Sequence, residues 1–534
     1  NMNDLYNDRT LFVTGASGFL GKVMIEKMLH SLPGIKRIYI LIRPSRGKSG
    51  AERWMELEKL ELFNRIRRDC PERLSKVVAV EGDISLPDLG ISSDDLKSVL
   101  EETSMVFHCA ATVRFNEPLK TAVELNMRGV TRVISLCHRM PKLECMLHCS
   151  TCYVNADKQG IKVEEKLYPA PCDPHKLIEA EDWMSESIFE SIGKGAAKSY
   201  GNTYCFTKAL SEHLVMEDTG SIPTIIFRPS IIGGIWKDGI PGWADTFQGI
   251  SAMLTALGTG AITRIPVDMS AHLDAIPVDI VSSAMIVCAG YRLQMSGSSI
   301  PIVHCNSSSV NPMIFENLRP SVMECAFKYP YEKVMSTPVF SPLGSDTLER
   351  SMHQMREKYV GPALDKIGSL VGKKPFWSRT YARIGETYMA LKKFMAAYTF
   401  ETENLMLLLD MMTDEDRETF NFDVRMINWN DYVFDLQLGI KVFLMKDDIV
   451  DPNKVKQARQ NLRLLQLKDF ISTFLLCYVC SVLFTGTTTA WQFFLPLTLI
   501  MHCYCSVFTY KPCGVPSIHE YKKRIEDAMG EPLK

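Results

Sequence analysis

The sequence has almost no net charge, since its 60 Lys and Arg residues are balanced by 62 Asp and Glu. A formal charge of −2 argues against nucleic-acid binding, which depends on a surplus of basic side chains. The amino terminus also lacks an apolar leader, so we expect no secretory signal. At 534 residues the chain exceeds one ordinary domain, and 46% hydrophobic residues suffice for a globular core.

The chain also lacks the cysteine spacing of a zinc site or a disulfide framework, although it has 16 cysteines. Cys149 and Cys152 form a Cys-x-x-Cys pair, but no second such pair occurs in a soluble region. Two other pairs of closely spaced cysteines, Cys477 with Cys480 and Cys503 with Cys505, lie in apolar surroundings. We therefore expect reduced thiols in the cytosol and no metal site.

One long segment has no charged side chains: Asp, Glu, Lys and Arg are all absent from Phe470 to Tyr510. A single membrane span needs about 20 apolar residues, so this segment is too long for one simple span. Residues 485–489 divide it into two apolar halves, and basic residues flank it on both sides, as is typical of loops retained in the cytosol. We expect a membrane anchor over residues 466–512, as a hairpin with both ends cytosolic. The alternatives are one span with an interfacial segment, or a buried helix for the first half.

A glycine-rich turn follows the apolar run at residues 11–13 and precedes an amphipathic helical pattern from residue 22. Glycines at this point allow a tight turn and a close approach of the backbone to a pyrophosphate at the helix N-terminus. The pattern predicts a nucleotide site. The residues expected to contact the nucleotide are Thr14, Gly15, Ser17, Gly18, Phe19, Leu20 and Gly21.

The second predicted strand, at residues 37–43, lacks the terminal acidic residue that NAD-binding enzymes use for the ribose. It ends in Arg43, with Arg46 close behind. These charges suit a 2′-phosphate and favour NADPH; the alternative is a solvated basic loop.

Two further strands complete the predicted nucleotide site. Asp83 and Ile84 follow the strand at residues 77–80, where an adenine ring would rest. Ala110 and Ala111 follow the strand at residues 105–108, and their small side chains leave room for the cofactor.

Tyr204 and Lys208 lie four residues apart, so a helix places them on one face. A neighbouring ammonium favours the phenolate and lowers the pKa of a tyrosine, which makes it a usable general acid or base. The alternative is an amphipathic helix with a solvated lysine.

With these elements, the chain resembles the extended short-chain dehydrogenase/reductases and, more narrowly, the eukaryotic fatty acyl-CoA reductases. The resemblance covers about residues 8–290 and is carried by residues 14–27, 108–115, 150–155, 202–212, 227–230 and 276–279. It implies an α/β fold with a Rossmann-type, doubly wound parallel sheet.

The resemblance also implies roles for single residues. Tyr204 is the expected acid, and Lys208 holds the nicotinamide ribose and lowers the tyrosine pKa. Ser150 or Thr151 donates a second hydrogen bond; neighbours on a strand face opposite ways, so we expect only one to act and prefer Thr151. Asn126 supports the lysine, unless it is a helix asparagine that bonds locally. Arg228 and Pro229 are assigned to the cofactor site.

The implied reaction is the NADPH-dependent reduction of a long-chain fatty acyl-CoA to a fatty alcohol through an aldehyde. The alternatives are a reductase or epimerase of the same superfamily that acts on a sterol or nucleotide-sugar, or a non-catalytic NADPH-binding scaffold. The expected partners are the acyl-CoA and a lipid membrane, with a homo-oligomer left open. Endoplasmic reticulum is the expected membrane, with peroxisomes and lipid droplets as alternatives.

We expect five parts along the chain. Residues 1–310 form the catalytic domain. This domain contains an insertion at 156–200 on the substrate side. A second insertion, at 242–262, either lines an acyl channel or contributes only to the packing of the core. Residues 311–354 are a linker, 355–465 a helical C-terminal domain that resembles that of the reductases, 466–512 the anchor and 513–534 a basic cytosolic tail.

Overall fold

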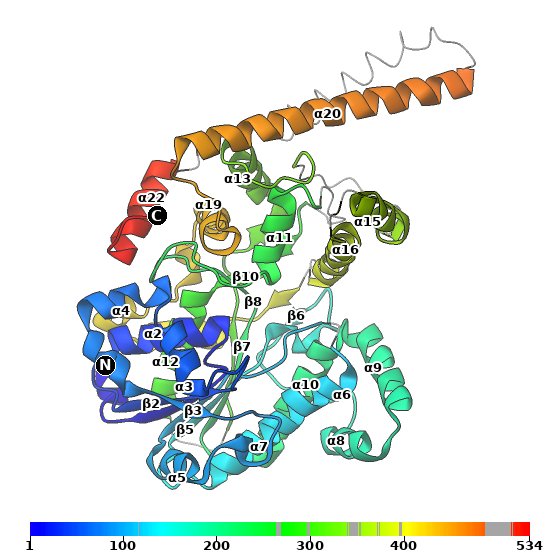
Figure 1. The fold of residues 1–534 in the computed structure, drawn as a ribbon. Helices are drawn as coiled ribbons and strands as arrows, with labels where there is room; N and C mark the ends of the chain where they lie inside the picture. Colours follow the sequence, from blue (N-terminus) through cyan, green and yellow to red (C-terminus); the bar gives the residue numbers. More distant parts are fainter. Residues whose placement is uncertain are drawn as a thin grey trace.

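A parallel sheet of seven strands forms the centre of the molecule (Figure 1). Its order is β11 (Ile302–Cys305), β7 (Thr224–Pro229), β5 (Cys145–Cys149), β4 (Met105–His108), β1 (Thr10–Thr14), β2 (Arg37–Ile42) and β3 (Val77–Glu81). The computed structural model describes residues 1–533 except 116, 263–268, 296–298, 339, 341–350, 352–353, 371, 373, 395–397, 486–513 and 515. The predicted Rossmann-type α/β fold is confirmed.

Helices cover both faces of the sheet, which explains why its strands are continuous apolar runs. On one face, α2 (Phe19–Ser31) packs beside α12 (Val278–Arg292). On the other face lie α5 (Ser93–Glu102), α7 (Gly129–His138) and α10 (Thr203–Asp218). The chain changes direction between β1 and β4, so the carboxyl ends of these two strands flank the switch point where such sheets bind ligands.

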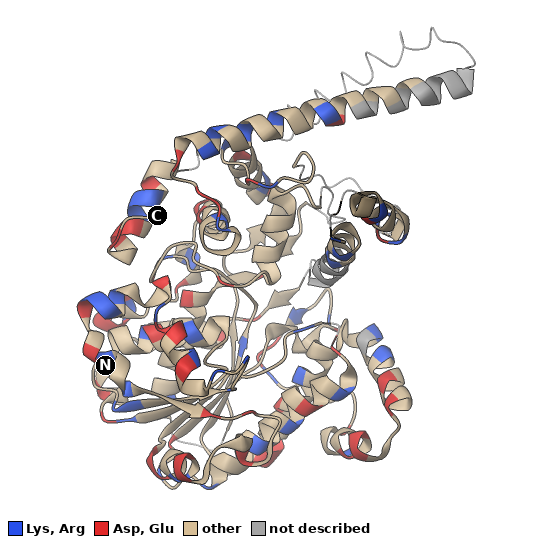
Figure 2. Ribbon diagram, in the orientation of Figure 1, with Lys and Arg blue, Asp and Glu red and all other residues tan. Residues whose placement is uncertain are grey.

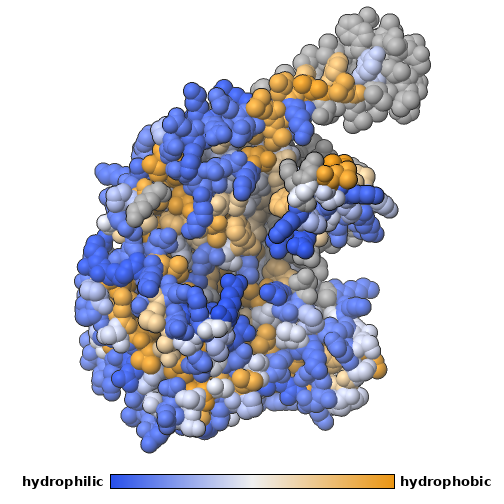
Figure 3. Space-filling model, in the orientation of Figure 1, coloured by the Kyte–Doolittle hydropathy of each residue, from blue (hydrophilic) through white to orange (hydrophobic). Residues whose placement is uncertain are grey.

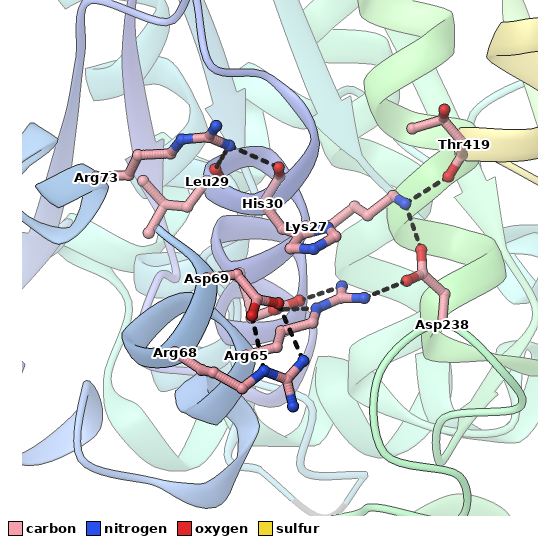
Figure 4. Close-up of polar contacts among 10 residues, drawn as sticks. Lys27, Leu29, His30, Arg65, Arg68, Asp69, Arg73, Asp238 and Thr419 are labelled. Atoms are coloured by element: carbon pink, nitrogen blue, oxygen red, sulfur yellow. Dashed lines mark hydrogen bonds and ion pairs between the residues drawn. The ribbon is translucent and has the colours of Figure 1, made fainter. Parts of the chain in front are cut away.

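A buried ion-pair network fixes α2 against the rest of the molecule (Figure 4). Lys27 pairs with Asp238 and donates to the carbonyl of Thr419, while Arg65 bonds both Glu26 and Asp238. Burial opposes the ionised form of Asp238, but the charges of Lys27 and Arg65 prevail and lower its pKa to about 2. The helix that carries the glycine turn is therefore held by residues from distant parts of the chain.

The C-terminal half packs on the sheet domain through several elements. The helices α13 (Phe315–Lys328) and α19 (Trp429–Gly439) lie together, and β13 (Thr399–Phe400) pairs in parallel with β6 (Lys162–Val163). Further helices of this half include α15 (Gly361–Leu370), α16 (Trp377–Phe394), α17 (Glu403–Met411) and α18 (Asp414–Thr419). The predicted helical C-terminal region is confirmed.

The expected linker at 311–354 is wrong for its first part. It contains β12 (Met313–Ile314) and the whole of α13, whose apolar side chains are buried. Pro320 lies inside α13 and does not end it. A proline in a helical pattern usually marks a boundary, and here tertiary packing outweighs that preference.

Two more helices follow in the C-terminal half. The long helix α20 (Pro452–Thr485) projects from the body, and α22 (Ile518–Met529) returns to it (Figure 1). Tyr521 and Ile525 of α22 are buried, and Arg524 pairs with Asp435 at 2.5 Å. Residues 518–529 are therefore part of the folded body, because their apolar face finds a partner there.

The predicted anchor at 466–512 falls partly outside the described residues, which end at 485 and resume at 514. Within the described part of the chain, no helix is both long enough and apolar enough to cross a membrane.

Candidate active site

The glycine turn joins β1 to α2 with little room for side chains. Gly15 has a φ of +74°, and a Cβ there would lie 2.7 Å from the backbone of Cys109 and Ala110. A Cβ on Gly21 would lie 2.3 Å from the Gly15 carbonyl oxygen. Gly18 caps α2, and its amide donates to Gly15 at 3.0 Å. The predicted turn therefore brings a helix N-terminus close to the carboxyl end of β4, as pyrophosphate binding requires.

The basic end of β2 is open to solvent. Arg43 is 65% exposed, and its guanidinium lies 3.7 Å from the Asp83 carboxylate. Arg46 is exposed and has a φ of +53° in the following turn. Both side chains are exposed at this edge of the sheet, and the only ion pair of Arg43 among the described residues is the long contact with Asp83.

The remaining residues predicted around the nucleotide line the same edge. The Asp83 carboxylate accepts hydrogen bonds from the amide and the hydroxyl of Ser85, each at 2.9 Å. Ile84 is buried, while Ala110 and Ala111 are partly exposed. The Ala110 amide donates to the Thr14 hydroxyl at 3.2 Å, which ties the end of β4 to β1. Their contacts with a cofactor stay a prediction.

Tyr204 and Lys208 both lie in α10, near its start. Asn202 caps this helix by accepting from the amide of Cys205 at 2.7 Å. The ring of Phe115 packs edge-on against Tyr204, with centroids 6.1 Å apart. Lys208 is buried, and its ammonium donates to the carbonyl of Cys149 at 2.7 Å. The helix therefore places both side chains at the carboxyl end of β5.

Ser150 and Thr151 follow β5 and face different partners. The Ser150 hydroxyl donates to Glu212 at 2.5 Å, away from the tyrosine. The Thr151 hydroxyl lies beside the phenol of Tyr204 and acts to lower the pKa of that phenol. Because Ser150 is bonded to Glu212, Thr151 is favoured as the second donor beside Tyr204.

The pKa of Tyr204 differs from the sequence-based expectation. Burial raises it, the nearby thiols of Cys205 and Cys149 add to the effect, and the hydrogen bond from Thr151 only partly offsets it. Burial likewise lowers the pKa of Lys208. The expected lowering of the tyrosine pKa by Lys208 is wrong for this state, because the ammonium is turned toward Cys149.

Asn126 lies in the π-helical turn η4 (Glu124–Arg128), and π turns are frequent at functional sites. Its amide nitrogen donates to the Thr112 carbonyl and to the Thr207 hydroxyl, at 3.2 and 3.1 Å. Its oxygen accepts from the Thr112 amide at 2.9 Å. These bonds join α10 to the loop after β4, and they leave Asn126 and Lys208 with separate partners.

The structure corrects the assignment of Arg228 to the cofactor. Its guanidinium is fully buried in a two-pronged ion pair with Glu212, at 2.8 and 2.6 Å, and lies 3.0 Å from His304. A side chain with its donors directed at these partners is not available to a phosphate. Pro229, also buried, ends β7 beside Cys305 of β11, and its contact with the cofactor stays a prediction.

Two insertions lie around this region. A cavity of about 350 Å³ borders the start of α10, between the 156–200 insertion and the C-terminal half. Its lining includes Tyr153, Tyr200, Cys205 and Tyr398. In the 242–262 insertion, by contrast, the apolar residues of α11 (Gly249–Gly258) are mostly buried in the main core, which favours packing over an acyl channel.

Sequence reasoning missed two buried histidines below the site, His108 of β4 and His148 of β5. Each occurs near the end of a strand that was otherwise predicted as apolar. That mismatch was the available signal, because a buried imidazole in an apolar strand needs a partner.

The parallel sheet, the glycine turn and the Tyr204–Lys208 helix define a nicotinamide-dependent reductase of the extended short-chain class. Two family models described as male sterility protein match the chain, an NAD-binding one over residues 13–285 and a second over residues 358–447. The chain belongs to this family, that of the fatty acyl-CoA reductases.

Curated relatives cover most of the chain. It is 34% identical to fatty acyl-CoA reductase 2 of Mus musculus, over 86% of this chain and 89% of that protein. It is 32% identical to fatty acyl-CoA reductase 1 of Homo sapiens, over 87% and 89%. Among solved structures, the terminal R domain of the myxalamid PKS-NRPS pathway has a TM-score of 0.56 at 19% identity, over 81% of this chain and 90% of that one. That likeness shows the fold.

Proposed function

We propose that this protein reduces a long-chain fatty acyl-CoA to the fatty alcohol through an aldehyde, with NADPH as the reductant. One observation carries the proposal: Thr151 and Tyr204 lie beside each other at the carboxyl end of β5. They lie on the sheet edge that also bears the glycine turn, with Lys208 on the same helix. Membership of the fatty acyl-CoA reductase family supports the substrate class.

The residues of the site act on the carbonyl oxygen of the thioester. Bound NADPH supplies a hydride to the carbonyl carbon in each of two rounds. In the first, the hydroxyls of Tyr204 and Thr151 stabilise the oxyanion that forms, and collapse of the hemithioacetal breaks the C–S bond and releases CoA thiolate. In the second, Tyr204 gives its proton to the alkoxide, so a primary alcohol leaves.

The raised pKa of Tyr204 suits this last step, because it keeps the phenol protonated until an alkoxide forms. Lys208, fixed by the carbonyl of Cys149 at 2.7 Å, would hold the nicotinamide ribose. A proton from solvent restores the phenol before the next round.

The choice of NADPH over NADH is supported by the charges at the end of β2. Arg43 and Arg46 are exposed there, where a 2′-phosphate would lie. No carboxylate ends the strand at Ile42 or Arg43 to favour a free ribose hydroxyl.

Membrane attachment through residues 466–512 is the second part of the proposal. Ala458 and Leu462 of α20 are buried, and Arg459 donates to the Lys328 carbonyl at 2.9 Å, so the start of α20 is fixed to the body. Since α22 packs on the same body, the chain is held to the body on both sides of the charge-free segment. This supports a hairpin over a single span, because a single span would separate the two ends.

The surface of α20 changes in character along its length. Figure 2 shows basic residues on its first half: Lys454, Lys456, Arg459, Arg463 and Lys468. Exposed apolar side chains begin between the last two of these basic residues, at Leu464 and Leu467, and continue at Ile471 and Leu475. Figure 3 shows an apolar stretch leading away from the body. Basic residues followed by apolar ones suit a helix that enters a membrane from its cytosolic side. We place the protein at the endoplasmic reticulum membrane, with its catalytic domain in the cytosol.

Replacing residues 470–512 by a Gly/Ser linker tests this part while it keeps α22. We expect the variant to leave the membrane fraction in flotation assays and to retain its folded catalytic domain. A variant that still floats with the vesicles contradicts attachment through this segment.

The experiment for the reaction is Tyr204→Phe in the full-length protein. We expect turnover to be abolished while NADPH binding, followed by fluorescence, is retained. Tyr39→Phe is the matched control, since the Tyr39 hydroxyl contacts Arg37 and Glu102 outside the proposed site. Activity that survives in Tyr204→Phe overturns the mechanism.

A further inference from the structure

Two histidines lie side by side in the sheet directly below the active site. His108 of β4 is paired in register with His148 of β5, and their ring centroids are 5.4 Å apart. Thr14 of β1 is in turn paired with His108. Both histidine side chains are buried, with 1% and 0% of their surface exposed. The three residues therefore form a row across the strands that carry the glycine turn and Ser150–Thr151.

One end of this row reaches Lys208. The Nε2 atom of His148 lies 3.5 Å from the Lys208 ammonium nitrogen. An ammonium only donates, so His148 accepts at Nε2 and carries its proton on Nδ1. At the other end, His108 Nδ1 lies 2.7 Å from the Thr14 hydroxyl, which itself accepts from the Ala110 amide.

The second ring nitrogen of each histidine has no hydrogen-bond partner among the described residues. These atoms, His108 Nε2 and His148 Nδ1, are both buried. Such atoms are costly to bury, and apolar side chains would fill these strand positions at lower free energy. Residues that break a local rule in this way are expected where function requires them.

We propose that His148 is a positioning residue for Lys208, and that His108, held by Thr14, fixes the orientation of His148. The proposal rests on the proposed function, in which Lys208 acts beside Tyr204. It gives His148 the supporting part that the sequence suggested for Asn126, whose amide is committed to Thr112 and Thr207.

The arrangement accounts for the protons of Lys208. One is donated to the Cys149 carbonyl and one is directed at His148, which leaves a third for a group in the active site. The titratable groups around the ammonium are His148 and Cys149 of β5, His108 of β4 with Cys109 directly after it, and Glu212 of α10. Both imidazoles are held neutral, because burial and the Lys208 charge lower their pKa values.

Loss of the acceptor at His148 has a predictable direction. Burial already lowers the pKa of Lys208, and an ammonium with one acceptor fewer is stabilised less. Lys208 would then lose its proton at a lower pH. As the pH is raised, activity that needs the charged lysine would therefore be lost at a lower pH than in the wild type.

The test compares His148→Leu with His148→Gln, because the glutamine carbonyl can accept where Nε2 does. The full-length protein in detergent is assayed with palmitoyl-CoA and NADPH across the pH range. We expect His148→Leu to move the alkaline limb of kcat down by about one pH unit, and so to lower kcat about tenfold at pH values above that limb. His148→Gln should restore most of both. His138→Leu, whose ring contacts the Asp218 carbonyl on the outer surface, should behave as the wild type.

Equal losses in the Leu and Gln variants with no shift of the alkaline limb overturn the proposal, as do wild-type profiles in both. A second measurement does not depend on the folding of the Leu variant. The ¹⁵N spectra of histidine-labelled wild-type protein should show that His148 carries a proton on Nδ1 and none on Nε2. The opposite tautomer overturns the proposal. If the wild type reduces no acyl-CoA, the proposed function fails, and the tautomer still decides the contact between His148 and Lys208.

Discussion

The hydroxyl of Ser150 donates to the carboxylate of Glu212 at 2.5 Å, deep beside the sheet. Glu212 also holds Arg228 through both carboxylate oxygens. Ser150 is thus the outer member of a buried polar cluster, whereas its neighbour Thr151 contacts the phenol of Tyr204. The two adjacent hydroxyls therefore have different roles. That of Ser150 stabilises the buried polar cluster, and that of Thr151 lies beside the reacting group.

Thr151→Val and Ser150→Ala should accordingly have opposite signatures. Thr151→Val removes a donor to the developing oxyanion and should lower kcat by about 10²-fold or more with little loss of stability. Ser150→Ala leaves Glu212 with one donor fewer and should lower the free energy of unfolding by about 1–3 kcal/mol with a small effect on kcat. Steady-state kinetics and thermal unfolding of both variants decide the matter, and a larger kcat loss in Ser150→Ala would reverse the assignment.

Arg228→Leu should destabilise the protein without weakening NADPH binding. It leaves the Glu212 carboxylate buried and unpaired, at a cost of about 3–5 kcal/mol. Thermal unfolding measures the loss, and fluorescence titration of the folded fraction measures the Kd for NADPH. A large rise in that Kd at unchanged stability would return Arg228 to the cofactor site.

Gly21→Ala should abolish NADPH binding, since its Cβ would lie 2.3 Å from the Gly15 carbonyl oxygen. The turn or the helix would have to shift, and the helix N-terminus would move from the pyrophosphate. Gly195→Ala is the matched control: Gly195 lies in α9 (Glu186–Tyr200), where a Cβ would meet nothing within 4 Å. That change should leave binding intact and stabilise the helix by up to about 1 kcal/mol. Normal NADPH affinity in Gly21→Ala would contradict the nucleotide site.

Arg43→Ala should lower kcat/KM for NADPH by about tenfold, because it removes a charge-assisted contact with the 2′-phosphate. The value for NADH should stay the same, which makes NADH the internal control. Equal changes for the two cofactors would show that the basic turn after β2 is only solvated surface.

Much of the fold could be predicted from the sequence because its signals are local. The glycine turn is contained in eight consecutive residues, and the strands buried on both faces are short apolar runs. The shared helix of Tyr204 and Lys208 follows from their spacing, whereas the burial of Lys208 does not.

The features that escaped prediction depend on residues far apart in the chain. Ser150 and Thr151 are distinguished by Glu212, which is 62 positions from Ser150, and Arg228 is removed from the cofactor by the same carboxylate. The burial of α22 depends on Asp435 and the body around it. The row of Thr14, His108 and His148 exists only once three strands are in register.

The most direct test of the central claim uses full-length protein in detergent with NADPH and saturated acyl-CoAs of about 12 to 26 carbons. NADPH loss is followed by absorbance while lipid products are identified by mass spectrometry. We predict fatty alcohol, with two NADPH consumed for each acyl-CoA. NADPH binding without consumption across the whole panel would contradict the reaction and point to another carbonyl substrate or a scaffold.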